Sequence, residues 1–314
     1  MKPVPELSVL IISYNTREMT LGCLRSIYKE TQSTSFEVIV LDNASGDGSA
    51  EAIASQFPDV RLLAETQNFG FAKGNNIASK FAEGEYILLL NPDTVVLDGA
   101  IEKLLSFSKR YPQAGIWGGR TLFGDLKLNP TSCWRRMSLW SIACRSFGLA
   151  NLFPSSEWLN SEGYGGWLRD TEREVDIVTG CLLLIRKKDW DELGGFDETF
   201  FMYGEEADLC IRARALGASP MITPSATIIH FDGASEKNRA DRMVRLLSAR
   251  VSLANRYFSR WKRIFAYALF ATSPLVRIVV YGVRSIGSSR RHANDLQLWL
   301  KVWQERRIWL RGYS

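Results

Sequence analysis

The sequence predicts an α/β protein with a Rossmann-like, mostly parallel central sheet, helices on both faces of that sheet, and a C-terminal amphipathic helical extension. Three observations support this prediction. Apolar, β-branched runs alternate with segments of helical spacing through residues 1–119, as in parallel βαβ units. Polar clusters stand directly after the apolar runs, where ligands bind in such sheets. From Arg239 onward the chain has a helical pattern that is basic and rich in Trp.

The expected elements follow this alternation. The run LSVLIISY (7–14) is continuous and apolar and predicts a buried strand, and TREMTLGCLRSIYKE (16–30) repeats apolar residues at helical spacing. Further strands are expected at 36–43, 60–65, 85–91 and 114–119, and further helices at 49–57, 75–82 and 99–111. Residues 120–174 lack a long period, which predicts irregular structure around a hairpin and a short helix at 139–147. Strands at 175–187 and 222–231 and helices from Arg239 complete the chain.

Composition narrows the class of protein. The chain has 314 residues, 46% of them hydrophobic, which is enough for a large core. Its first residues, MKPVPELSVLIISYN, do not have the pattern of a signal peptide. The five cysteines are widely spaced and form no C-x-x-C pair, which argues against a disulfide framework or a zinc site and for a reducing compartment.

Charge is unevenly distributed along the chain. Residues 239–314 hold 16 Lys and Arg against 3 Asp and Glu, a net +13, and since the whole chain carries +5, residues 1–238 carry −8. An acidic body joined to a basic tail indicates a binding partner for the tail. We therefore expect one domain over 1–238 and a basic, Trp-rich helical tail over 239–314 that binds a membrane or forms oligomers.

Two acidic residues follow predicted strands. Asp93 follows Asn91 and Pro92, where its carboxylate could hold a divalent cation that bridges phosphate oxygens, although N-P-D is also good turn chemistry. Asp42 ends the second strand before a loop rich in Gly and Ser, where it could accept hydrogen bonds from a ribose or a base. Both a ligand-binding and a purely structural role stay open for each at this point.

Two further segments could contact phosphate. The stretch NFGFAKGNN (68–76) could bring backbone amides and the charge of Lys73 close to a phosphate, although it lacks the G-K-[ST] of a Walker loop. His230 ends an apolar strand before the loop HFDGAS, and a neutral imidazole there could complete a metal site or contact a diphosphate. A structural role is the alternative for this histidine.

The stretch FFMYGEEADLCIRARALG (200–217) crowds three carboxylates behind aromatic residues. Acidic residues in the first turn of a helix are stabilised by its dipole, which is one explanation. The other explanation is a catalytic base in a partly desolvated pocket. On a helix Asp208 and Arg212 are four residues apart and are expected to form a structural pair.

The order of these motifs is more specific than any one of them. SVLIISYNT, VLDNASGDGS, NFGFAKGNN, LLLNPDT, VTGCLLLIRK, GGFDETFFMYGEEADLCIRARALG and HFDGAS together resemble glycosyltransferase family 2 of the GT-A fold, in particular its bacterial rhamnosyltransferase-like branch. The resemblance covers roughly residues 7–235. It implies a nucleotide-sugar half over 1–119 and an acceptor half over 120–238.

The resemblance also implies roles for individual residues. Asn91–Pro92–Asp93 is this chain's version of the metal-binding D-x-D motif, with Asp93 and His230 on the metal side and Mg²⁺ or Mn²⁺ as the cofactor. Where the family usually has E-D-x-D-L this chain has Glu205–Glu206–Ala207–Asp208–Leu209, so Glu206 is the expected base, with Glu205 and Asp208 as rivals. The expected substrate-binding residues are Ser13, Tyr14, Asn15, Asp42, Asn43, Lys73, Asn75, Asn91 and Gly180.

The implied activity is inverting, metal-dependent transfer of a sugar, with rhamnose favoured, from a dTDP-, UDP- or GDP-linked donor to a hydroxyl of a lipid-linked saccharide in cell-envelope polysaccharide synthesis. A catalytically silent protein that binds sugar nucleotides or lipid is one alternative, supported by the E-E departure from the family pattern. A sugar nucleotidyltransferase is another, opposed by the lack of a Gly-rich loop in IISYNTREM.

The tail contains a mostly apolar run, IFAYALFATSPLVRIVVYGV (264–283), long enough to cross a bilayer. Pro274 and Arg277 lie inside this run, and basic residues flank it. Further on, LQLWLKVWQERRIWLRGY interleaves Trp and Leu with Lys and Arg, as interfacial helices do. We expect contact with the cytoplasmic face of the inner membrane, with homo-oligomer packing and true spanning as the alternatives. No motif supports nucleic-acid binding.

Overall fold

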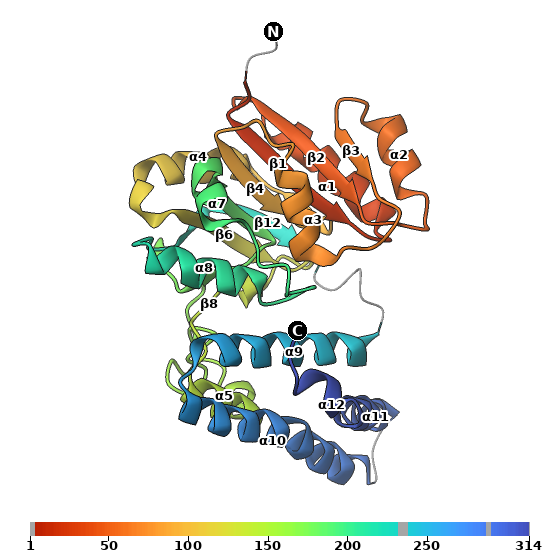
Figure 1. Cartoon of the computed structure of the whole chain (residues 1–314), viewed down its shortest axis with the longest axis vertical. Helices are drawn as coiled ribbons and strands as arrows, with labels where there is room; N and C mark the ends of the chain where they lie inside the picture. The colour runs from red at the N-terminus through yellow and green to blue at the C-terminus, as the bar shows by residue number, and fades with distance from the viewer. Residues whose placement is uncertain (1–3, 232–237, 287–289, 314) are drawn as a thin grey trace. The chain divides into compact units, whose positions relative to one another are not determined.

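The computed structural model describes residues 4–231, 238–286 and 290–313 (Figure 1). The chain forms two compact units. The first comprises residues 1–134, 168–201 and 205–235, and the second comprises residues 135–167, 202–204 and 236–314. Residues 135–167 therefore group with the C-terminal helices. The division of 1–238 into a nucleotide-sugar half and an acceptor half concerns function and stays a prediction.

The first unit is built on a ten-stranded sheet in the order β3-β2-β1-β4-β11-β6-β12-β5, with two short strands at its side. Its parallel part is β3 (Arg61–Ala64), β2 (Phe36–Asp42), β1 (Leu7–Ser13) and β4 (Tyr86–Leu90). Next come β11 (Leu182–Arg186), β6 (Ile116–Leu122), β12 (Met221–His230) and β5 (Thr94–Val96). The predicted parallel core is confirmed, and every predicted strand except the one at 175–187 forms as a single strand.

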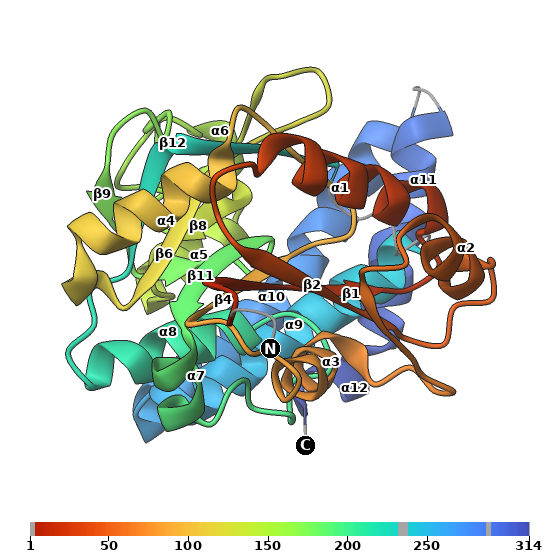
Figure 2. The same cartoon turned by 90° about the horizontal axis from the view of Figure 1, so that it is seen from above.

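Helices cover both faces of this sheet (Figure 2). One face carries α1 (Arg17–Glu30) and α4 (Ala100–Arg110), and the other carries α3 (Gly70–Ser79), α7 (Lys187–Leu193) and α8 (Glu205–Ala215). The short helix α2 (Ser49–Gln56) packs beside α1 and β3. Leu21, Leu24 and Ile27 show why α1 forms here: they recur at helical spacing, and all three are buried in the main core.

Four details differ from the sequence prediction. The predicted strand at 175–187 is divided into β10 (Ile177–Val178) and β11, because Thr179 and Gly180 interrupt it. Strand β11 then runs antiparallel between β4 and β6, so these two parallel strands are not neighbours. Helix α3 begins at Gly70 rather than at residue 75. The short strand β5 was not predicted.

Small elements complete the first unit. They are η1 (Pro112–Ala114), β7 (Leu128–Asn129), η2 (Pro130–Ser132), β8 (Cys133–Trp134) and β9 (Arg173–Glu174). Strand β7 pairs with β6 as the predicted hairpin, β8 pairs with β10, and β9 pairs with β12. All five cysteines of the chain are free and buried.

The second unit is helical. It contains α5 (Leu139–Ser146), α6 (Leu149–Leu152), α9 (Arg239–Tyr257), α10 (Arg260–Ser285), α11 (Arg290–Gln304) and α12 (Arg306–Trp309). These helices enclose a separate core that includes Val251, Phe270, Val302 and Trp309. Helix α10 packs on α5 and α11, which explains why residues 135–167 belong to this unit.

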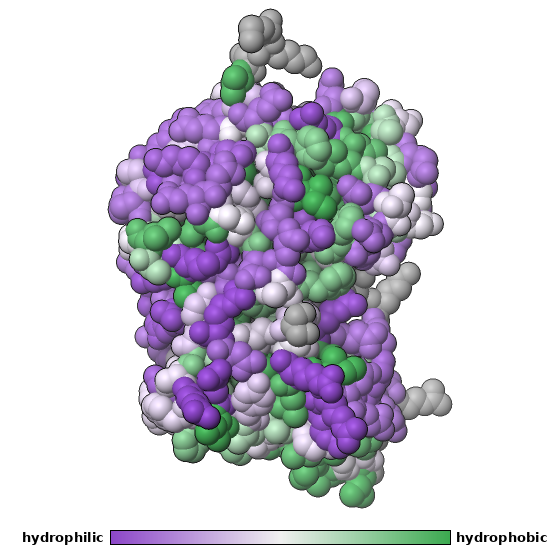
Figure 3. All heavy atoms as spheres, viewed as in Figure 1, coloured by the Kyte–Doolittle hydropathy of each residue, from purple (hydrophilic) through white to green (hydrophobic). Residues whose placement is uncertain are grey.

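Helix α10 has one buried and one exposed side. Trp261, Ile264, Phe265, Val279 and Val283 recur along it at helical spacing, and each is at least 56% exposed. Figure 3 shows hydrophobic residues gathered over this helix. Within the described part of the chain, α10 is the one helix long and apolar enough to cross a membrane, and only 22% of its apolar window is buried.

Candidate active site

The polar clusters predicted from the sequence lie at one edge of the sheet. Strands β1 and β2 end in register at Ser13 and Asp42, and β4 ends just before Asn91. Strand β12 is parallel to β6 and also ends at this edge, with His230 opposite Thr94 of β5. The carboxyl ends of parallel strands are where this class of sheet binds ligands.

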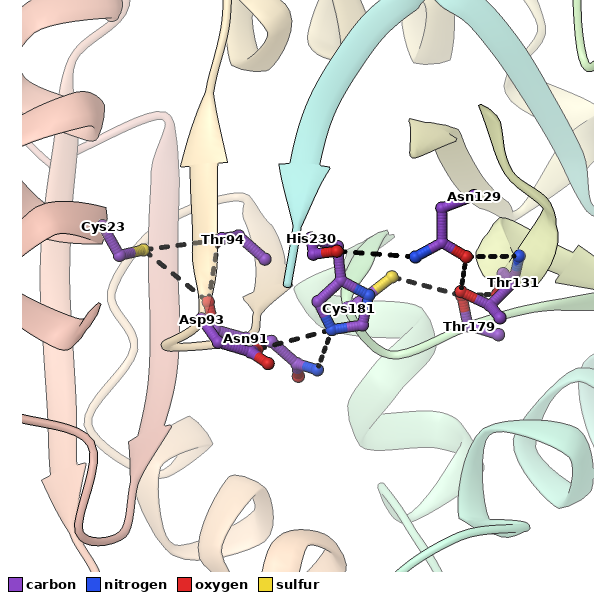
Figure 4. A network of polar contacts seen from close by, with 9 residues as sticks. All are labelled: Cys23, Asn91, Asp93, Thr94, Asn129, Thr131, Thr179, Cys181 and His230. Atoms are coloured by element: carbon purple, nitrogen blue, oxygen red, sulfur yellow. Dashed lines mark hydrogen bonds and ion pairs between the residues drawn. The ribbon is translucent and has the colours of Figure 1, made fainter. Parts of the chain in front are cut away.

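Asn91, Asp93 and His230 form a polar cluster at this edge, in which Asp93 and His230 are buried and Asn91 is half-buried (Figure 4). The His230 Nε2 atom lies 3.2 Å from Asn91 Nδ2 and 3.4 Å from Asp93 Oδ1. The turn that presents them is held by Thr94, whose hydroxyl donates to the Asn91 carbonyl oxygen at 2.8 Å. Asn91 Oδ1 is buried and has no hydrogen-bond partner among the described residues, so it is available to a ligand.

Charge around His230 favours its protonated form. Burial of the ring acts to lower the pKa of His230, but the Cys181 sulfur and the Asp93 carboxylate outweigh it and raise that pKa to about 11. A divalent cation at this place would reverse the effect, since it would compete with the proton for the same lone pair.

The donor set fits a hard cation that is shared with a substrate. Among the described residues no group of three or more His, Cys, Asp or Glu side chains could hold a metal by itself. Mg²⁺ and related cations are commonly held by one or two carboxylates together with waters and substrate phosphates. Asp93, with Asn91 Oδ1 unpartnered beside it, offers hard oxygen donors of this kind.

The ends of β1 and β2 are tied together by side chains. Asn15 accepts a hydrogen bond from the Gly46 N–H at 2.9 Å, and its own N–H donates to Ser45 Oγ at 2.9 Å. Asp42 accepts from the Ser45 N–H through Oδ1, while its buried Oδ2 has no partner within the described ranges. Asp42 is therefore the acceptor that this corner offers to a ligand.

Several predicted binding residues have structural partners. The Ser13 hydroxyl is within hydrogen-bond distance of Thr16 and Thr20, and Asn43 bridges Phe69 N and the Gly70 carbonyl oxygen. Asn75 donates to Phe71 O inside α3. Side chains used in this way position the loops, whereas the side chain of Tyr14 is exposed.

The start of α3 lies against the segment that precedes α8. Gly70 has φ +78°, and a Cβ there would stand 2.3 Å from the Phe201 carbonyl oxygen, so only glycine fits. The Phe71 N–H donates to that same oxygen at 2.8 Å. Lys73, predicted to approach phosphate, lies 3.7 Å from Glu198 Oε2, and both side chains are nearly half exposed.

One short segment, Val178–Cys181, contacts α3, α8 and the Asn91–Asp93–His230 cluster. Val178 N lies 3.5 Å from Cys210 Sγ of α8, and the Thr179 hydroxyl donates to the carbonyl oxygens of Thr131 and Ser132. Gly180 lies against the ring of Phe71, and the Cys181 carbonyl oxygen accepts from Asn91 N at 3.3 Å. This segment links the Asn91–Asp93–His230 cluster to α8.

The three carboxylates of α8 differ in burial. Asp208 is fully buried, and the predicted pair is confirmed, with 2.7 Å between Arg212 Nε and Asp208 Oδ2. Glu205 is 3% exposed, whereas Glu206 is only partly buried. Glu206 is thus the least buried of the three carboxylates.

Sequence reasoning overlooked two residues of this region, Asn76 and Cys181. Asn76 accepts from the Phe196 N–H through Oδ1 and donates through Nδ2 to the Phe196 carbonyl oxygen and to Glu198, which fixes α3 to the 196–198 turn. Cys181 contacts His230 and was considered only as one of five cysteines. Its place directly after Gly180, at the start of a strand, was the available signal.

Fold and site together define a nucleotide-sugar-dependent transferase of the GT-A type. The profile of glycosyl transferase family 2 matches residues 8–193, and the chain belongs to this family. It is a family 2 glycosyltransferase with rhamnosyltransferases among its relatives, as predicted.

Two relatives illustrate the similarity in sequence. N-acetylglucosaminyl-diphospho-decaprenol L-rhamnosyltransferase of Mycobacterium tuberculosis is 28% identical over 74% of this chain and 79% of its own length. Rhamnosyltransferase WbbL of Escherichia coli is 29% identical, and the match covers 63% of this chain and 77% of WbbL.

The structural neighbours share the fold at low identity. The mannosyltransferase PcManGT from Pyrobaculum calidifontis, solved with GDP-Man and Mn²⁺, has a TM-score of 0.56 and 18% identity over 99% of this chain and 84% of its own. GalNAc-T7, solved with UDP, GalNAc and Mn²⁺, has a TM-score of 0.62 and 13% identity. That match covers 87% of this chain and 52% of the GalNAc-T7 chain. The predicted GT-A fold is confirmed.

Proposed function

We propose that this chain is an inverting, metal-dependent glycosyltransferase that moves a sugar, with rhamnose favoured, from a nucleotide-diphospho-sugar to a hydroxyl of a lipid-linked glycan. The observation that carries the proposal is the convergence of the Asn91–Asp93–His230 cluster and α8 on the segment Val178–Cys181. Relatives named as rhamnosyltransferases, one of them acting on a decaprenol-linked sugar, support the sugar and the acceptor class.

The residues divide the work between donor and acceptor. Asp42 Oδ2 accepts a hydrogen bond from the nucleoside of the donor, which lies over the ends of β1 and β2. Glu206 takes the proton from the acceptor hydroxyl as that oxygen attacks the anomeric carbon from the side opposite the leaving diphosphate. One bond forms and one breaks, so the configuration inverts without a covalent intermediate.

Asp93, with Asn91 and His230 beside it, would hold Mg²⁺ or Mn²⁺ together with the diphosphate, and the cation would stabilise the charge that grows on the leaving group. When no cation is bound, a protonated His230 would offset the charge of the Asp93 carboxylate.

The exposed residues of the C-terminal unit favour the proposal that the acceptor is bound to a membrane. The exposed apolar stripe of α10 begins between Arg260 and Lys262 and ends beside Arg284, all of them exposed cations. Apolar residues flanked by Lys and Arg suit the surface of an anionic bilayer. Arg277 lies within hydrogen-bond distance of the carbonyl oxygens of Arg145 and Ser146, so α10 is bound along one side by its own unit. We propose that it lies in the cytoplasmic face of the cell membrane rather than crossing it.

The test combines donor binding with turnover. A thermal-shift series of dTDP, UDP and GDP, each with and without Mn²⁺ or Mg²⁺, identifies the nucleotide, because a ligand at about 100 times its Kd stabilises the fold by ~2.7 kcal/mol. The matching sugar nucleotides are then incubated with a polyprenyl-diphospho-GlcNAc acceptor, and the product is analysed for its anomeric configuration.

Variants separate the proposed activity from its alternatives. Glu206→Gln should abolish transfer while donor binding survives, and Glu206→Asp, which gives the family's usual residue, should retain it. Asp93→Asn should abolish transfer and the effect of the cation on nucleotide binding. Nucleotide binding without transfer to any acceptor would favour a silent binding protein, and release of pyrophosphate from a sugar phosphate and a nucleoside triphosphate would favour a nucleotidyltransferase.

A further inference from the structure

Tyr313, close to the C-terminal end of the sequence, contacts the segment that leads into α8. Its hydroxyl donates to the Met202 carbonyl oxygen at 2.6 Å and lies 3.4 Å from the Arg245 carbonyl oxygen of α9. Residues 202–204 belong to the same compact unit as α9 and Tyr313. They also directly precede Glu205 and Glu206, which begin α8.

The segment Met202–Gly204 has an unusual backbone. Tyr203 has φ 69° and Gly204 has φ 92°, so two consecutive residues adopt left-handed conformations directly before the proposed base. A bulky side chain rarely adopts this conformation, and it persists where the surroundings hold it. The Met202–Tyr203 peptide plane sets both the direction of the Met202 carbonyl and the φ of Tyr203. A hydrogen bond to that carbonyl therefore holds the strained turn.

Tyr313 is itself firmly positioned. Its N–H donates to Ser252 Oγ of α9 at 2.7 Å. The preceding Gly312 has φ +75°, and a Cβ there would stand 2.6 Å from the same Ser252 Oγ, so the chain passes close to α9. Four residues before Tyr313, Trp309 is fully buried in the helical core and donates to the Val302 carbonyl oxygen at 2.8 Å. The hydroxyl is thus presented from a fixed backbone.

We infer that Tyr313 is a positioning residue for catalysis: through the Met202 carbonyl it fixes the Tyr203–Gly204 turn and so the orientation of Glu206 at the start of α8. This inference rests on the proposed role of Glu206 as the base. It assigns the C-terminal helices a part in the reaction besides membrane binding. Small displacements of a catalytic group cost rate even when substrate still binds, so the contact should act on kcat and not on donor KM.

The test compares Tyr313→Phe with Tyr267→Phe. Both variants remove one hydroxyl from the same helical unit, since the Tyr267 hydroxyl donates to Asn255 Oδ1 at 3.0 Å, far from residues 202–204 in sequence. Amide hydrogen exchange of the peptide 200–209 should accelerate in Tyr313→Phe and stay unchanged in Tyr267→Phe.

The kinetics give a second measurement. In Tyr313→Phe kcat should fall about tenfold, with donor KM unchanged, as expected for loss of one hydrogen bond. Ser252→Ala should lower kcat in the same direction, and the double variant should add little to either single change.

The outcomes distinguish this inference from the proposed function. If wild-type protein transfers no sugar, the proposed function fails, while the exchange measurement still tests whether Tyr313 holds the turn. If exchange of 200–209 does not change in Tyr313→Phe, the positioning contact is wrong. If exchange changes while kcat does not, or if Tyr267→Phe lowers kcat as much, Tyr313 has no role in positioning the base.

Discussion

Arg212 Nε lies 2.7 Å from Asp208 Oδ2, one turn along α8, and the same guanidinium donates to the carbonyl oxygens of Leu193 and Gly195 at 2.7 and 2.8 Å. Asp208 is fully buried, so this carboxylate has a structural partner on the same helix that bears the proposed base. We expect Asp208→Asn to destabilise the fold by about 2 kcal/mol, because it leaves a partly buried cation without its counter-charge. Urea unfolding checks this value.

The Asp208→Asn protein should still catalyse sugar transfer once it is folded. Activity per folded molecule is expected to remain within about tenfold of wild type, in contrast to Glu206→Gln. Loss of all transfer in a stably folded Asp208→Asn protein would contradict this assignment and make Asp208 the candidate base.

His230 offers a second prediction. Its side chain contacts both Asn91 and Asp93, so removing it should loosen the cation site without unfolding the sheet. We expect His230→Ala to raise the cation concentration for half-maximal activity by about 10- to 100-fold, as loss of metal-site partners does. Titration of activity with Mn²⁺ measures this shift. His292→Ala, which changes the chain's other histidine in α11, should leave the titration unchanged.

Much of the sheet follows from local pattern. The strand β1 is buried along its whole length, as its continuous apolar run predicts, and α1 and α4 begin and end within a residue or so of their predicted bounds. These elements are specified by residues close together in sequence. The insertion of β11 between β4 and β6 is not, because it depends on pairing across distant segments that no local period encodes.

The site shows the same limit. The strand-end residues Asp42, Asn91 and Asp93 could be selected from the sequence because turn chemistry follows an apolar run. The contact of Gly70 and Phe71 with Phe201 could not, since it joins residues that are far apart in sequence and depends on the position of the Phe201 carbonyl oxygen. Which of Glu205, Glu206 and Asp208 is accessible also required the structure, because burial depends on what packs on α8.

The exposed stripe of α10 predicts membrane binding that can be weakened without unfolding. Ile264 and Phe265 are 67% and 58% exposed, so the double change Ile264→Glu/Phe265→Glu should abolish co-sedimentation with vesicles that contain anionic lipid. Leu216→Glu, at a site 66% exposed in the other unit, is the matched control and should bind as wild type does. Binding retained by the α10 variant at unchanged oligomeric state would exclude this face as the membrane surface.

A buried ion pair predicts how the helical unit responds to acid. Arg250 binds both carboxylate oxygens of Glu162, and Arg145 lies 3.4 Å from the same group. Burial alone would raise the pKa of Glu162, but the two guanidinium groups lower it to about 2. A carboxylate whose pKa is lowered by folding stabilises the folded state above its unfolded value, here 4.5, and loses that contribution as pH falls towards about 2. The shift corresponds to roughly 3 kcal/mol at neutral pH.

Glu162→Gln should therefore lower the free energy of unfolding by roughly 3 kcal/mol at neutral pH, and the difference from wild type should shrink as pH falls below 4.5. Trp fluorescence during urea unfolding follows this unit, because seven of the ten tryptophans lie in it. Glu305→Gln is the control: its pair with Lys301, at 4.0 Å, is partly exposed and should contribute at most about 1 kcal/mol. A difference between Glu162→Gln and wild type that stays constant from neutral pH to about 2 would show that packing, not charge, makes Glu162 important, because only an ionised carboxylate can lose its contribution by protonation.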